Sequence, residues 1–252
     1  MIRCTILKRP SAKIKSPYVA DIQLEDGTIA LLHTPGLGCC GLVETGRIVY
    51  AVPSGRESKT DYSARIAECT DSVGVHYVGI HPFVSQEAAR DVLPILGDNV
   101  RWTSEVVVED GTRLDFVGTR LDGKQIYVEV KTAMVSMECE KERGLRRAIF
   151  PEGYKKRKGD PVSPRAIKHC NVLARLCGQE DTADCYLIFM IPRNDCGDGM
   201  IVNVQDPYAG ALADAVRAGV KVRAFTMNYG VDGSVKVERE VPFYCDFSLT
   251  QK

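Results

Sequence analysis

The sequence predicts an α+β protein in two parts, a small β-barrel followed by an α/β domain with a mixed sheet. Short alternating segments with close turns near the N-terminus are typical of a small barrel. Near the C-terminus, the order strand, helix, strand implies a parallel pair of strands within a larger sheet. We place the boundary after residue 82, so that the predicted domains are residues 1–82 and 83–252.

The N-terminal part alternates between apolar and polar residues at positions 18–24, 28–32 and 46–52, and each of these segments predicts a strand. Asp26 and Gly27 provide a turn between the first two segments. The loop TPGLGCCG at residues 34–41 contains three glycines. Its backbone is therefore free to approach a ligand or a neighbouring strand closely, or to form a tight structural turn.

The second part begins with a predicted helix over residues 84–96, with Ser85 as its N-cap and Pro94 limiting its C-terminal end. Three strands then form a predicted antiparallel meander, with Asp110 and Gly111 in the first turn and residues 121–124 in the second. Residues 139–164 are charged and interrupted by Gly and Pro, which predicts a long loop over the face of the sheet that would carry an active site.

After this loop, apolar residues recur at helical spacing from Arg165, and Gly178 predicts the end of that helix. Residues 185–192, CYLIFMIP, are continuously apolar, as expected for a central strand covered on both faces. Asp206 and Pro207 predict the start of a helix that ends at Gly219, and a strand follows at residues 221–226. Residues 234–247 alternate again and predict an edge strand.

The candidate site lies on two strands of the meander. Alternation in residues 125–131 places Glu129 and Lys131 on the same face, and Asp115 in the preceding strand can lie beside Glu129. Two carboxylates at one polar spot suit a hard divalent cation, which prefers oxygen ligands. The Lys131 ammonium could orient an attacking water or neutralise charge on a phosphate. The same spacing also fits a solvated polar face of an exposed strand.

Composition excludes several classes of protein. A chain of 252 residues with 44% hydrophobic and 26% charged residues is not a disordered one. No apolar run approaches the roughly 18 residues of a membrane helix, and the N-terminus lacks the apolar core of a signal peptide. We therefore expect a cytoplasmic protein without membrane contact. The ten cysteines lack CxxC spacing, which predicts reduced thiols rather than a disulfide framework or a zinc site.

The formal net charge is zero, but residues 141–168 contain ten basic and three acidic residues. A positive patch near a metal site suits a phosphate backbone, and the same composition also fits a solvated, mobile loop. Lys168 and His169 could contact a phosphate, or they could be a surface lysine and a partly buried histidine. The candidate nucleic-acid-binding residues are Arg146, Arg147, Lys155, Lys156, Arg157, Lys158, Arg165, Lys168 and His169.

Several motifs occur in a recognisable order: HTPGLGCCG from His33, RLDF from Arg113, YVEVK from Tyr127, AIFPEG from Ala148 and RAIKH from Arg165. Together with the segment DPYAGALADAVRAGVKVRAF at residues 206–225, they resemble the sugar fermentation stimulation protein A family over about residues 17–225. The chain departs from that family by extra basic, Gly and Pro residues between the fourth and fifth motifs.

The carboxylate Asp115 followed by Glu129-Val130-Lys131 resembles the core of the PD-(D/E)XK nucleases. This resemblance implies a PD-(D/E)XK-like α/β domain after an oligonucleotide-binding (OB) type of barrel. It implies that Asp115, Glu129 and Lys131 are catalytic. It also implies that Asp115 and Glu129 bind Mg²⁺ or Mn²⁺, with Glu87, in the helix before the catalytic strands, as a further metal ligand.

The expected function is therefore nucleic-acid binding with metal-dependent cleavage of phosphodiester bonds, with DNA favoured over RNA as the substrate. One alternative is a DNA-binding regulator of sugar (maltose) metabolism that does not cut, which the name of the resembled family implies. A further alternative is a protein that recognises a small metabolite or another protein. No Ser-His-Asp arrangement, Walker-type loop or dinucleotide fingerprint offers another enzyme class. The oligomeric state stays open.

Overall fold

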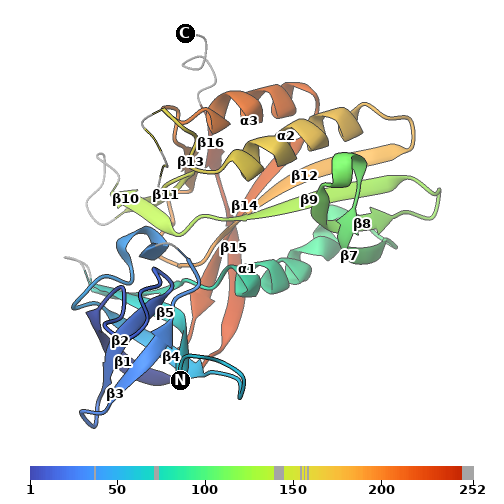
Figure 1. Cartoon of the computed structure of the whole chain (residues 1–252). Coiled ribbons are helices and arrows are strands. Elements are labelled where there is room, and N and C mark those ends of the chain that lie inside the picture. Colours follow the sequence, from blue (N-terminus) through green and yellow to red (C-terminus); the bar gives the residue numbers. More distant parts are fainter. Residues whose placement is uncertain are drawn as a thin grey trace.

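The computed structural model describes residues 1–36, 38–70, 74–138, 145–153, 155, 157 and 159–245. A compact group of strands from the N-terminal third lies beside a long mixed sheet, with two helices on one face of that sheet and one on the other (Figure 1). This arrangement confirms the predicted fold class, a small barrel followed by an α/β part with a mixed sheet.

The N-terminal sheet has the strand order β3-β2-β1-β4-β5-β6, and it closes because β3 also pairs in parallel with β5, Leu32 opposite Tyr62. Inward-facing residues such as Ile6, Ile22 and Val49 are fully buried and fill the barrel. The strands are β1 (Ile2–Lys8), β2 (Val19–Leu24), β3 (Ile29–His33), β4 (Ile48–Pro53), β5 (Tyr62–Thr70) and β6 (Val75–Gly79).

The long sheet has the order β15-β14-β12-β9-β8-β7. Its strands β7, β8 and β9 form the predicted antiparallel meander, whereas β12 pairs in parallel with both β9 and β14. The predicted parallel pair is therefore confirmed as β12 and β14. The strands are β7 (Arg101–Val107), β8 (Arg113–Thr119), β9 (Gln125–Thr132), β12 (Thr182–Ile191), β14 (Lys221–Tyr229) and β15 (Val235–Val241).

A third, four-stranded sheet corrects the prediction of one long loop over residues 139–164. Residues 146–150 form a strand, because Ala148 is fully buried and the Phe150 ring packs 5.0 Å from that of Tyr208. These apolar contacts outweigh the charged local sequence. The sheet consists of β10 (Val135–Glu138), β11 (Arg146–Phe150), β13 (Met200–Val202) and β16 (Phe243–Tyr244).

Helices cover both faces of the long sheet (Figure 1). α2 (Pro164–Cys177) and α3 (Tyr208–Arg217) lie on one face, and α1 (Pro82–Ala88) with the 3₁₀ segment η2 (Ala89–Leu96) lies on the other. Two shorter 3₁₀ turns are η1 (Gly38–Gly41) and η3 (Glu109–Gly111).

Two of the predicted helix starts need correction. α3 begins at Tyr208 with Pro207 rather than Asp206 as its N-cap, although the Tyr208 N–H donates to the Asp206 carboxylate. The prediction that Ser85 caps α1 is wrong, because the helix begins at Pro82, whose fixed φ suits a first helical position, and Ser85 is buried inside it. For α2, Ser163 is the N-cap and accepts a hydrogen bond from the Ala166 N–H. The predicted stop at Gly178 is confirmed.

The strand β12 carries the centre of the hydrophobic core. Leu187 and Phe189 face α2 and α3, whereas Ile188 and Met190 face α1, and all four are fully buried. This confirms the prediction of a central strand covered on both faces. The core on the α1 side also contains Tyr50 and Ile66 of the barrel, so these barrel residues pack directly against the long sheet, beside the separate core of the barrel itself. The domain boundary after residue 82 stays a prediction.

Within the described residues, no helix combines the length and the apolar character needed to cross a membrane. The nine cysteines in this part of the chain are free thiols, and five of them, including Cys4 and Cys170, are buried.

Gly79, at the end of β6, allows close packing between the barrel and the long sheet. A Cβ atom at this position would lie 2.2 Å from the Cζ atom of the buried Tyr229. We expect Gly79→Ala to lower the free energy of unfolding by about 1–3 kcal/mol, because the core is overpacked. Gly210→Ala in α3 should raise it by about 0.5–1 kcal/mol, because that site is open and Ala favours a helix. Urea denaturation followed by circular dichroism measures both, and equal effects would contradict the packing argument.

Candidate functional site

The candidate site forms where β9 faces the start of α2. Glu129 and Lys131 point to the α2 side of the sheet, as the alternation of β9 predicts. The Lys131 Nζ lies 2.5 Å from the Glu129 Oε1. Glu129 is only 3% exposed, so its charge needs partners inside the protein.

A second partner of Glu129 comes from α2. His169 Nδ1 contacts the same Oε1, and Arg165, one helical turn earlier, donates from its Nε to His169 Nε2 at 3.2 Å. Because Nε2 accepts this hydrogen bond, the ring proton lies on Nδ1 and is donated to Glu129. In the described part of the chain, the other oxygen, Oε2, is buried without a hydrogen-bond partner.

Asp115 on β8 is fixed by two hydrogen bonds. The backbone N–H of Val130 donates to its Oδ2 at 2.6 Å, and the side-chain amide of Gln86 on α1 donates to its Oδ1 at 2.8 Å. Gln86 also donates to Glu105 on β7. These contacts place Asp115 beside β9, as the sequence predicts, and hold its carboxyl group in one orientation.

The two carboxyl groups respond oppositely to their surroundings. Burial, followed by the charge of Glu129, raises the pKa of Asp115 to about 7, against the lowering effects of the Val130 N–H and Lys131. Burial also acts to raise the pKa of Glu129, but the His169 hydrogen bond and the Lys131 charge outweigh it and hold that pKa below the ordinary value. Glu129 is therefore ionised near neutral pH, whereas Asp115 is only partly ionised there.

The donor set fits a hard divalent cation. A buried carboxylate oxygen without a partner is costly, and a cation would satisfy Glu129 Oε2. Among the residues that the structure describes, no three His, Cys, Asp or Glu side chains gather closely enough to hold a metal. A metal at this place would thus have two protein carboxylates rather than three. Asp115 and Glu129 could hold Mg²⁺ or Mn²⁺ in this way, with water completing the coordination, which is a common arrangement for Mg²⁺.

The structure does not bring Glu87 into this site, which corrects the expectation that it is a third metal ligand. Its carboxylate is half exposed and lies 3.5 Å from the Arg90 Nε, one helical turn away. Ser85 in α1 and Ala89 at the start of η2 are buried, so the neighbouring Gln86 faces the sheet and Glu87 points away from it. The helical register could have indicated Gln86, although its amide is not a residue type usually sought at a metal site.

Two of the candidate nucleic-acid-binding residues lie on β11, away from the carboxylates. Arg146 donates to Ser136 at 2.8 Å and lies 3.6 Å from Asp195. Arg147 forms an ion pair with Asp198, and its guanidinium stacks 4.7 Å from the centre of the Tyr244 ring. Acidic neighbours thus offset much of the charge that the sequence places here.

The remaining basic candidates surround the start of α2. Lys155 forms a 3.1 Å ion pair with the buried Asp206, whereas Arg157, Arg165 and Lys168 are exposed. Lys168 donates to a backbone carbonyl at 3.3 Å. His169 is buried with both ring nitrogens engaged, in line with the alternative of a partly buried histidine. Lys156 and Lys158 lie outside the described residues.

Comparison with known proteins identifies the family. The sequence model of the sugar fermentation stimulation protein RE domain matches residues 80–233, which include every residue of the site. The chain belongs to the sugar fermentation stimulation protein family. It is 30% identical over 237 residues to the family homolog of Alteromonas mediterranea, with 89% of each chain covered. The family homolog of Desulfotalea psychrophila is 26% identical over 212 residues, with 82% of each chain covered.

The fold of the family is also represented among solved structures. Pyrococcus furiosus SfsA, determined in complex with Ca²⁺, matches with a TM-score of 0.73. The match covers 96% of this chain and 95% of that one at 20% sequence identity. At this identity, the likeness shows that the sugar fermentation stimulation family fold extends over the barrel and the long sheet together.

The raised pKa of Asp115 predicts how the stability of the metal-free protein depends on pH. The folded state holds this proton up to about pH 7, whereas the unfolded chain releases it near pH 4. The stabilisation is therefore complete below about pH 4 and is lost as the pH rises to about 7, at no more than about 1.4 kcal/mol per pH unit. Urea denaturation at pH 4–8 in chelator should show this fall, and Asp115→Asn should flatten it. Parallel curves for the two proteins would contradict the assignment.

Proposed function

We propose that this chain binds nucleic acid and hydrolyses phosphodiester bonds in DNA with Mg²⁺ or Mn²⁺, without excluding RNA. The observation that carries the proposal is the buried Glu129 carboxylate, which has one oxygen bound by Lys131 and His169 and the other without a partner in the described residues. Asp115 lies on the adjacent strand and completes a pair of oxygen donors. A carboxylate on one strand followed by Glu-x-Lys on the next is also the order found in the nuclease core that this chain resembles.

A bound divalent cation would activate a water and stabilise the charge that develops on the phosphate. Asp115 and Glu129 would hold it, and the hydrogen bonds from Val130 and Gln86 would keep Asp115 in position. Metal binding favours an ionised Asp115, so that carboxyl would release the proton that its burial retains.

Lys131 and the start of α2 would act on the phosphate. The Lys131 side chain is 13% exposed, so its ammonium borders both Glu129 and the solvent from which a substrate arrives. Once a cation neutralises Glu129, the Lys131 ammonium is free to orient water or to stabilise negative charge. His169 holds Glu129 in place, and the exposed Arg165 that supports His169 offers a guanidinium to the phosphate.

The barrel and the exposed basic side chains near α2 supply a path for nucleic acid. The barrel strands pair in the order β1-β2-β3-β5-β4, with β4 returning to β1, which is the order expected of an OB-type barrel. Arg157, Arg165 and Lys168 are exposed near α2 and suit a phosphate backbone. The solved relative was determined with Ca²⁺, a cation that also takes oxygen ligands, which supports a hard cation in this chain. We place this activity in the cytoplasm.

A DNA-binding regulator that does not cut is the second candidate. The Glu129 carboxylate is already paired with the Lys131 ammonium and accepts a hydrogen bond from His169, and the described residues provide no third acidic ligand, so the fold does not depend on a bound metal. The family description names sugar fermentation stimulation, and a role in sugar metabolism fits a regulator of this kind. This candidate needs the exposed basic side chains but not the pair of carboxylates.

Cleavage assays decide between the two candidates. End-labelled single- and double-stranded DNA and RNA are incubated with Mg²⁺, Mn²⁺ or chelator. We expect metal-dependent cleavage that falls at least about 100-fold in Asp115→Ala and Lys131→Ala, because each removes transition-state stabilisation. Asp91→Ala, an exposed carboxylate outside the site, serves as the matched control and should cleave normally. Circular dichroism checks that all variants are folded. Cleavage that persists in Asp115→Ala would refute the proposed centre, whereas binding without any cleavage would support the regulator.

The salt dependence of DNA binding tests whether the exposed basic side chains contact the phosphate backbone. Each phosphate contact contributes about one unit to the slope of log affinity against log salt concentration. We expect Arg157→Ala to reduce that slope by about one unit, and Lys236→Ala, an exposed cation on the edge strand β15, to leave it unchanged. Fluorescence anisotropy with a labelled oligonucleotide measures the slopes in chelator. A slope that does not change in Arg157→Ala would remove this residue from the binding surface.

A further inference from the structure

Two adjoining cavities lie at the junction of the barrel and the C-terminal part. Neither is lined by Asp115, Glu129, Lys131 or His169. The larger has a volume of about 640 Å³, and the smaller has a volume of about 320 Å³. Cys40 and Met134 line both of them, so the cavities meet at these two side chains. Each volume lies in the range of small-molecule sites, which is about 300–1,000 Å³.

Three arginines from separate parts of the chain line the smaller cavity. Arg47 comes from the segment before β4, Arg146 from β11, and Arg193 from the segment after β12. Arg193 is buried and forms a two-pronged ion pair with Asp195 at 2.5 and 2.6 Å. Arg47 is exposed, and its guanidinium has no hydrogen bond or ion pair to any other described residue.

Among the described residues around this cavity, positive side chains outnumber negative ones. Asp195 lies near Arg193, near Arg146 at 3.6 Å and near His76 at 3.9 Å, and it supplies a single negative charge. Glu138 reaches Arg146 at 3.5 Å, but its side chain is 59% exposed and is screened by solvent. The positive charge of Arg47 is therefore not balanced within the described residues.

The thiol of Cys69 lines the same cavity and feels the charge of all three guanidinium groups. Burial raises the pKa of Cys69, and the charges of Arg193, Arg47 and Arg146 all act to lower it. Cys69 itself lines the cavity together with Thr70 and Ser136, whose hydroxyl groups are of the kind that contact phosphate oxygens.

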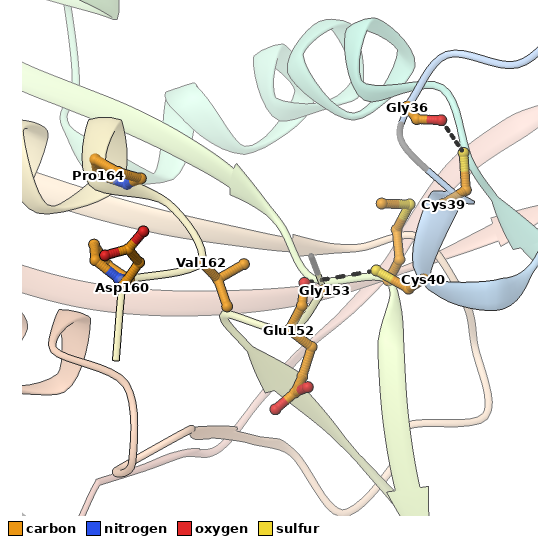
Figure 2. Close-up of a pocket in the computed structure, with 10 residues that line it drawn as sticks. Gly36, Cys39, Cys40, Glu152, Gly153, Asp160, Val162 and Pro164 are labelled. Atoms are coloured by element: carbon orange, nitrogen blue, oxygen red, sulfur yellow. Dashed lines mark hydrogen bonds between the residues drawn. The ribbon is translucent and has the colours of Figure 1, made fainter. Parts of the chain in front are cut away.

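The larger cavity is mainly apolar (Figure 2). Cys39 and Cys40 form one wall, and Gly153 and Val162 lie opposite on the segment before α2. The Glu152 carboxylate points away from Cys40 in Figure 2, because it accepts a 2.6 Å hydrogen bond from Asn203. Its charge still acts on the Cys40 thiol, whose pKa is raised by burial and then by Glu152.

The wall formed by the two cysteines has an unusual backbone. Cys39 and Cys40 have φ angles of 41° and 56°, which L side chains rarely adopt. Hydrogen bonds from their thiols help to hold this conformation, to the carbonyl of Gly36 at 3.8 Å and to that of Glu152 at 3.6 Å. Such strained residues cluster at ligand sites, where the surrounding structure fixes them.

We propose that the two joined cavities bind one nucleoside monophosphate unit, with its phosphate among Arg47, Arg146 and Arg193 and its base in the apolar cavity. The Arg47 fork matches phosphate oxygens, and Arg146 and Arg193, which are held by Ser136 and Asp195, add positive charge around it. A flat base suits a cavity lined by thiols, Met134 and aliphatic groups. Asp160 lines the apolar cavity beside Pro164, away from Cys40 in Figure 2. Its carboxylate would accept a hydrogen bond from the exocyclic amino group of the base.

The nucleotide could be free in solution, or it could be the terminal unit of a nucleic-acid strand, because the two offer the same phosphate and base. This site uses neither Asp115 nor Glu129. It therefore stands whether or not the chain cleaves DNA, and its test is carried out in chelator, where metal-dependent cleavage does not contribute.

Isothermal titration of the full chain with dAMP, deoxyadenosine and inorganic phosphate tests the phosphate half. We expect dAMP to bind most tightly, and Arg47→Ala to weaken it at least about fivefold, because a charge-assisted contact is lost. Arg56→Ala, a matched exposed arginine of the barrel outside both cavities, should leave the affinity unchanged. Equal weakening by both variants would show general charge attraction and would overturn the site.

A second variant tests the base half. Val162→Phe fills the apolar cavity, because Val162 lines it, with its Cγ1 and the Cys40 Sγ each 3.8 Å from the position that a Cβ at Gly153 would take. We expect dAMP to bind at least about tenfold more weakly, with inorganic phosphate unaffected. A 5′-phosphorylated oligonucleotide that binds more tightly than dAMP identifies a strand end as the occupant, and the reverse order identifies a free nucleotide. No binding of either probe to the folded wild-type chain would refute the proposal.

Discussion

The buried carboxylate of Glu129 is the constraint on which the local architecture depends. An unpaired charge in the interior is strongly destabilising, so the fold must bring cations and donors to it. Lys131 comes from the same strand, two residues later, and is placed by the alternation of β9 alone. His169 comes from α2, so the helix must begin at the right residue and lie at the right height above the sheet.

That requirement explains features outside the site. Ser163 and Pro164 fix the first turn of α2, and the apolar side of this helix packs against β12. On the other face of the same sheet, α1 carries Gln86 to Asp115, and the core beneath it includes barrel residues such as Tyr50. The barrel therefore supports the strands that hold both carboxylates through the barrel residues in this core.

Much of the fold and part of the site could be predicted from the sequence, because they depend on short-range patterns. The alternation of β9, the apolar run of β12 and the stop at Gly178 are local signals, and each was sufficient. Burial of Ala148 and the ring contacts of Phe150 depend on distant strands, so β11 could not be separated from its charged surroundings. The contacts of Gln86 and His169 likewise require the distance between a helix and the sheet, which no local pattern gives.

The strand β11 also changes the meaning of the basic stretch around it. Successive residues of a strand point to opposite sides, so Arg146 and Arg147 cannot face the same partner. One reaches Asp195 at the junction with the barrel, and the other reaches Asp198 and the Tyr244 ring. Charge that is continuous along the sequence is thus divided between two surfaces in space. A single duplex lying on this protein would meet only half of the cations that a linear count assigns to the strand.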